Sequence, residues 1–91
     1  MYLVVVTVEH PEGGAPPAER LRRAVRESAA ASDRLQHAYL EADGCRISFC
    51  LYLQAPTRLE ALSLADQLCR RTMASVADTP RWRVRSTYIG P

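Results

Sequence analysis

The alternation of apolar and polar side chains along the chain predicts four β-strands. Residues 2–9 are rich in valine and apolar at both alternations, which is typical of a central strand buried on both faces. Residues 34–42, 45–54 and 81–89 alternate instead between apolar and polar positions. The Asp43-Gly44 pair predicts the tight turn of a β-hairpin between the second and third of these strands.

Helical spacing of apolar side chains predicts two helices, at residues 17–31 and 57–76. The first has a narrow apolar stripe flanked by arginines, which is typical of a helix that buries one face. In the second, Thr57 and Glu60 have the spacing of a capping box, in which a side chain accepts a free N–H at the helix start. Each helix therefore separates two strands along the chain.

The resulting order, β-α-β-β-α-β over residues 1–91, resembles the ferredoxin-like α/β plait. The resemblance covers the whole chain but rests on the order of the elements, not on a sequence motif. It implies one α+β domain, with a four-stranded antiparallel sheet and both helices on one face. The strand order of that fold, 4-1-3-2, places the first and third strands in the centre, which agrees with their apolar character.

Such a sheet has one face under the helices and one uncovered face. From residues 45–54, we expect the side chains under the helices to be Ile47, Phe49, Leu51 and Leu53. From residues 81–89, we expect the face that contains Val84 to point the same way, and alternation puts on that face also Trp82, Ser86 and Tyr88. The uncovered face then carries Ser48, Cys50, Tyr52, Arg83 and Arg85. Two alternatives are open for residues 34–42. Either Ala38 and Leu40 point inward and leave His37 and Tyr39 outward, or Leu35 and Tyr39 point inward.

Composition adds little about function. All 12 basic residues are arginine, a bias typical of a GC-rich genome such as an actinobacterial one, and the net charge of +2 is too low to indicate a nucleic-acid-binding protein by itself. The three cysteines form no C-x-x-C motif and no signal peptide is recognisable, so we expect a cytoplasmic protein with free thiols. The apolar run at residues 3–6 is too short to span a membrane.

No metal or cofactor site is predicted. His10 lies between Glu9 and Glu12, but the spacing of a zinc motif is missing. The topology also resembles that of dimeric α/β-barrel proteins, some of which are cofactor-independent monooxygenases or cyclases with a pocket lined by histidine and aromatic side chains. For an enzyme of that kind, the candidate catalytic residues are His37, Tyr39, Tyr52 and Trp82. No paired carboxylates and no nucleophile with an adjacent base support this alternative.

Three functional hypotheses follow. The first is a small binding or accessory module that forms homo-oligomers through its uncovered sheet face, because the helices cannot cover both sides of the apolar first strand. Its other partners would be a protein or a small molecule. The second is the enzyme described above. The third is a nucleic-acid-binding plait in which Tyr52 stacks on bases beside Arg83 and Arg85, with Tyr2 as an optional second stacking residue.

Overall fold

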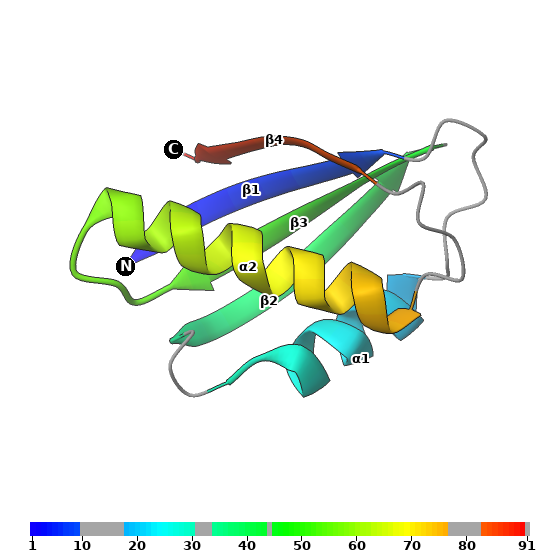
Figure 1. Cartoon of the computed structure of the whole chain (residues 1–91), viewed down its shortest axis with the longest axis horizontal. Helices are drawn as coiled ribbons and strands as arrows, with labels where there is room; N and C mark the ends of the chain where they lie inside the picture. Colours follow the sequence, from blue (N-terminus) through cyan, green and yellow to red (C-terminus); the bar gives the residue numbers. More distant parts are fainter. Residues whose placement is uncertain (10–17, 31–33, 44, 77–82, 91) are drawn as a thin grey trace.

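The computed structural model describes residues 1–9, 18–30, 34–43, 45–76 and 83–90. The elements are β1 (Tyr2–Glu9), α1 (Ala18–Ser28), β2 (Leu35–Asp43), β3 (Arg46–Leu53), α2 (Arg58–Val76) and β4 (Arg83–Ile89). They form an α+β fold with one antiparallel sheet in the order β2-β3-β1-β4 (Figure 1). The ferredoxin-like topology and the central position of β1 and β3 are as predicted.

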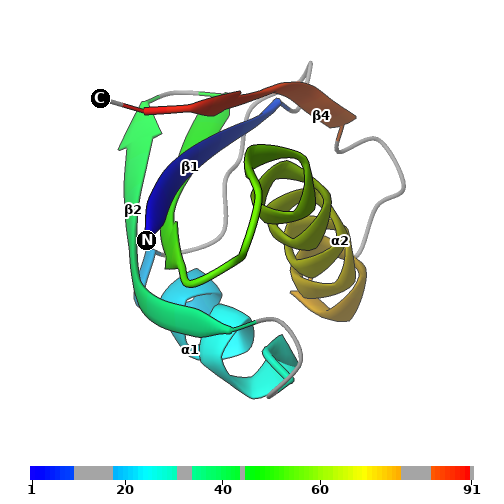
Figure 2. The same cartoon turned by 90° about the vertical axis from the view of Figure 1, so that its left-hand side faces the viewer.

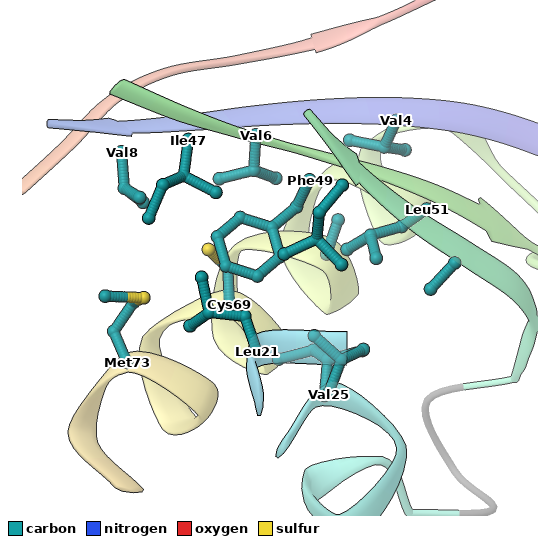
Figure 3. Packing of buried hydrophobic residues seen from close by; sticks show 14 of the residues in the cluster. Val4, Val6, Val8, Leu21, Val25, Ile47, Phe49, Leu51, Cys69 and Met73 are labelled. Atoms are coloured by element: carbon teal, nitrogen blue, oxygen red, sulfur yellow. The ribbon is translucent and has the colours of Figure 1, made fainter. Parts of the chain in front are cut away.

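Both helices lie on the same face of the sheet (Figure 2). The core lies between the helices and the sheet and contains side chains from β1, β2, β3, α1 and α2. At its centre, Phe49 is fully buried and points from β3 toward Leu21 and Val25 of α1 and toward Cys69 of α2 (Figure 3). Helix α1 ends at Ser28, earlier than the expected residue 31, although the Ala29 N–H still donates a helical hydrogen bond to the Val25 carbonyl at 2.9 Å.

The other face of the sheet is not covered by a helix, and we call it the open face. It carries alternate side chains of each strand, as the strand register requires. These are Leu3, Val5, Thr7 and Glu9 of β1, His37, Tyr39 and Glu41 of β2, Arg46, Ser48, Cys50 and Tyr52 of β3, and Arg83, Ser86 and Tyr88 of β4.

An irregularity in β2 decides between the two alternatives that its sequence left open. The register shifts between Leu35 and His37, so that one extra residue, Gln36, stands on β2. Ala38 and Leu40 are buried in the core, and Leu35 packs against it. Because of the extra residue, Leu35 and Ala38 lie on the same side. His37 and Tyr39 therefore lie on the open face, opposite Tyr52 and Cys50.

A second register shift corrects the prediction for β4. We expected Val84, Ser86 and Tyr88 to share the helix-covered face, but the shift between Thr7 and Val8 makes Arg85 an extra residue on β4. Val84 and Ile89 pack against the core, whereas Tyr88 pairs with Val5 on the open face. Strict alternation fails here because an inserted residue reverses the side-chain direction beyond it. Trp82, also expected in the core, lies outside the described residues.

Within the part of the chain that the structure describes, neither helix is long and apolar enough to cross a membrane.

Candidate functional site

The open face divides into an apolar half and a polar half, because the register aligns similar side chains in rows across the strands. One row places Val5 between Cys50 and Tyr88, and the next toward the start of β1 pairs Leu3 with Tyr52. In the opposite direction, Thr7 lies between Ser48 and Ser86, and Glu9 between Arg46 and Arg83. The first two rows are aromatic and aliphatic, and the last two are hydroxylic and charged.

Three rings form a cluster at the β2 side of the apolar half, which we call the aromatic trio: His37, Tyr39 and Tyr52. The ring centroids are 6.1 Å apart for His37 and Tyr39, 6.1 Å for His37 and Tyr52, and 6.3 Å for the two tyrosines. The ring planes are tilted, which suits the favoured geometries of aromatic pairs. Three of the four residues proposed for an enzyme pocket are therefore neighbours. The fourth, Trp82, lies outside the described residues.

The Cys50 thiol beside the trio and the Tyr39 hydroxyl within it are both neutral at neutral pH. Burial raises the pKa of the Cys50 thiol; a hydrogen bond with Tyr39 lowers it by a smaller amount, and the charge of Glu41 adds a still smaller rise. The nearby Cys50 and Tyr52 raise the pKa of the Tyr39 hydroxyl. Neither group is thus poised as a thiolate nucleophile or a phenolate base, and the cluster has the character of a contact surface.

In the polar half, the carboxylate of Glu9 on β1 contacts side chains of β3 and β4. The Oε2 atom of Glu9 accepts hydrogen bonds from Arg46 Nε at 2.9 Å and from Arg85 Nη1 at 3.2 Å. Next to this group, the hydroxyls of Thr7 and Ser48 are 3.4 Å apart. Glu9 therefore links β1 to both of its neighbouring strands and occupies one guanidinium, Arg85, that was a candidate for binding a ligand.

The two edges of the open face differ in charge and shape. Glu41 stands on the β2 edge, and Arg83 stands on the β4 edge. Neither side chain forms an ion pair with another described residue. Tyr88, also on β4, is 51% exposed and is one of three large apolar or aromatic side chains of the described chain with such exposure, the others being Met1 and Leu59. Tyr88 is thus an exposed aromatic group on the β4 edge of the apolar half.

A separate hollow of about 420 Å³ lies on the α1 side of β2, where the end of the helix meets the start of the strand. Its walls come from both elements and include Arg26, Ala29, Ala30, Arg34, Leu35, Gln36, His37 and Ala38. The sequence contains no signal for this hollow, because its two walls meet only in the folded chain. His37 is the one lining residue that also belongs to the aromatic trio.

The structure brings most of the predicted site residues together. Ser48, Cys50 and Tyr52 lie on the open face, and Arg83 lies in the same row as Glu9. Tyr2 pairs with Leu53 and packs against the core, so it is not a second stacking residue beside Tyr52 on the open face. Tyr88 was missed, because only the register shift in β4 turns it outward. His10 and Glu12 lie outside the described residues.

Among the described residues, no three side chains of His, Cys, Asp or Glu lie close enough to hold a metal ion. Comparisons of the chain with protein-family models, with curated proteins and with solved structures found no match.

Proposed function

We propose that this chain is a small binding module whose open face packs against the open face of a second copy. The observation that carries the proposal is the apolar half of that face. It joins side chains of all four strands in one patch: Leu3, Val5, His37, Tyr39, Cys50, Tyr52 and Tyr88. The helices lie on the far side and do not cover it. A continuous apolar patch of this kind on a small domain typically marks an interaction site.

The size of the face suits a weak to moderate dimer. Four strands about 4.8 Å apart and eight residues of about 3.3 Å each give a face of roughly 19 by 26 Å. Pairing two such faces removes on the order of 500 Å² from each copy, or about 1,000 Å² in total, which is near the lower limit for a specific interface. We therefore expect dissociation in the micromolar range rather than a permanent dimer.

The side-chain chemistry favours this function over catalysis and nucleic-acid binding. Tyr39 and Cys50 are held in their neutral forms, which leaves the aromatic trio without an activated nucleophile. On the polar half, Glu9 neutralises part of the charge that Arg85 would offer to a phosphate. A contact surface needs neither an activated group nor free positive charge, so self-association requires the fewest additional features.

The test is the mass of the protein in solution as a function of concentration. Wild-type protein should pass from one-chain to two-chain mass between about 1 and 500 µM in analytical ultracentrifugation. Val5→Asp places a charge in the middle of the open face and should remain a monomer throughout. Leu59→Asp is the matched control, because Leu59 is 78% exposed on α2, and it should associate like the wild type. Circular dichroism checks that both variants fold.

A one-chain mass for the wild-type protein over that whole range would refute the proposal. Equal loss of association in Val5→Asp and Leu59→Asp would also count against it, because the helix layer would then contribute as much as the sheet face.

A further inference from the structure

The open face has two pairs of complementary features, and the members of each pair stand on opposite edges. The exposed ring of Tyr88 lies on β4, and the aromatic trio lies on β2 and the adjacent β3. Edges of a four-stranded sheet are three strand spacings apart, or about 14 Å. Tyr88 thus stands three strand spacings from His37 and Tyr39 and two from Tyr52, and among the described residues no ring contact joins it to the trio of its own chain.

The charges repeat this arrangement in the polar half. Glu41 is exposed on the β2 edge, and Arg83 is exposed on the β4 edge, again with two strands between them. Neither has an ion-pair partner among the described residues. An acidic group on one edge and a basic group on the other thus accompany an aromatic cluster on one edge and an aromatic ring on the other.

We infer that a second copy docks on the open face about a two-fold axis parallel to the strands, so that β2 of each copy lies over β4 of the other. This inference rests on the proposed self-association and adds its geometry. Such a rotation exchanges the two edges of the sheet but keeps each row at its own height along the strands. It gives the aligned packing, with strands about 30° apart, that is common for paired sheets.

In this arrangement each feature meets its complement twice, because a two-fold interface is isologous. Tyr88 packs on the aromatic trio of the partner subunit, with Tyr39 in the corresponding row. Glu41 comes within the reach of Arg83 of the partner subunit, one row further along. In the centre, Cys50 and Tyr52 of β3 lie over β1 of the partner subunit, where the same rows hold Val5 and Leu3.

The in-plane two-fold axis perpendicular to the strands does not satisfy both pairs. That axis places β2 of one copy over β2 of the other and β4 over β4. The edge that carries Tyr88 then faces the same edge of the second copy, and the two aromatic trios face each other. The two Glu41 side chains then lie on the same edge of the dimer, as do the two Arg83 side chains. If that axis passes through the middle of the face, it also packs the apolar half on the polar half.

The test is a set of dimer dissociation constants, measured by ultracentrifugation on the full chain. Tyr88→Ala should weaken dimerisation at least about tenfold, since the same aromatic contact is lost twice in a two-fold interface, and Tyr88→Phe should change it little. Glu41→Arg and Arg83→Glu should each weaken it several-fold, and the double variant should recover most of the loss because both ion pairs are restored with reversed sign. Leu59→Ala is the control and should have no effect.

The outcomes distinguish a wrong dimer axis from a failure of self-association. A wild-type protein that stays monomeric overturns the proposed function and the axis with it. A wild-type dimer that tolerates Tyr88→Ala, or whose two charge variants simply add in the double variant, overturns the axis alone. Recovery in the double variant together with the loss in Tyr88→Ala supports both. Thermal unfolding of each variant identifies any loss that comes from misfolding.

Discussion

Phe49 and Tyr52 lie three positions apart on β3 and point to opposite faces of the sheet. Truncating each of them therefore tests which face of the sheet packs against the core. Phe49 is 0% exposed and packs between the two helices (Figure 3). Phe49→Ala should lower the free energy of unfolding by about 3–5 kcal/mol, because it removes the buried ring and leaves a cavity that the helices cannot fully close. A domain of 91 residues is stable by roughly 5–14 kcal/mol, so this loss is a large share of the total.

Tyr52→Ala removes contacts with His37 and Tyr39 on a face that water reaches, and it should cost only about 1 kcal/mol. The assay is urea unfolding followed by circular dichroism at about 1 µM or less, where the dimer is dissociated and adds no stability by mass action. Phe49→Leu provides an intermediate step and should lose less than Phe49→Ala. If Tyr52→Ala were as costly as Phe49→Ala under these conditions, the assignment of the two faces would be wrong.

Three further predictions concern single contacts. Burial raises the pKa of the Cys69 thiol from 9.0 to about 12, so between these pH values the thiol is neutral in the folded protein and ionised in the unfolded chain. The free energy of unfolding should therefore be unaffected below pH 9 and fall by about 1.4 kcal/mol per pH unit toward pH 12. Urea unfolding at a series of pH values measures this decline, which should be shallower in Cys69→Ala. Glu9→Gln weakens two exposed ion pairs and should cost no more than about 1 kcal/mol in the same urea assay. Gly90→Ala places a Cβ 2.8 Å from Leu3 Cδ2, so the Leu3 side chain must shift on the open face; dimerisation should weaken several-fold in ultracentrifugation, whereas urea unfolding of the monomer should change by less than about 1 kcal/mol.

The order and pairing of the strands were predictable because they depend on hydrophobicity averaged over whole elements. The valine-rich β1 has apolar side chains at both alternations, and such a strand is stable only in the centre of a sheet that is covered on at least one side. In β3, every second residue from Ile47 to Leu53 is a large apolar residue and is fully buried, so its inward face could be predicted directly. Local pattern and tertiary burial agree in these two strands, and no partner is needed to interpret them.

The direction of side chains in the edge strands was not predictable in the same way. Gln36 and Arg85 are ordinary residues, and nothing in their local sequence marks them as the extra residues of a register shift. A shift of this kind depends on the partner strand as well as on the strand that contains it. Glu9 illustrates this dependence, because it binds Arg85 across a separation of 76 residues in the chain. The position of Tyr88 depends on the shifted pairing of β4 with β1, which alternation alone does not contain.

Both register shifts lie in edge strands, and this placement connects the fold to the proposed interface. A bulge interrupts the regular row of backbone groups on an edge and so discourages pairing with the edge of another sheet. The shifts also set the open face, since His37 and Tyr39 follow Gln36, and Tyr88 follows Arg85. Without the shift in β4, the alternation that places Val84 toward the core would place Tyr88 there too. The same two irregularities thus oppose association through the edges and supply the aromatic side chains for association through the face.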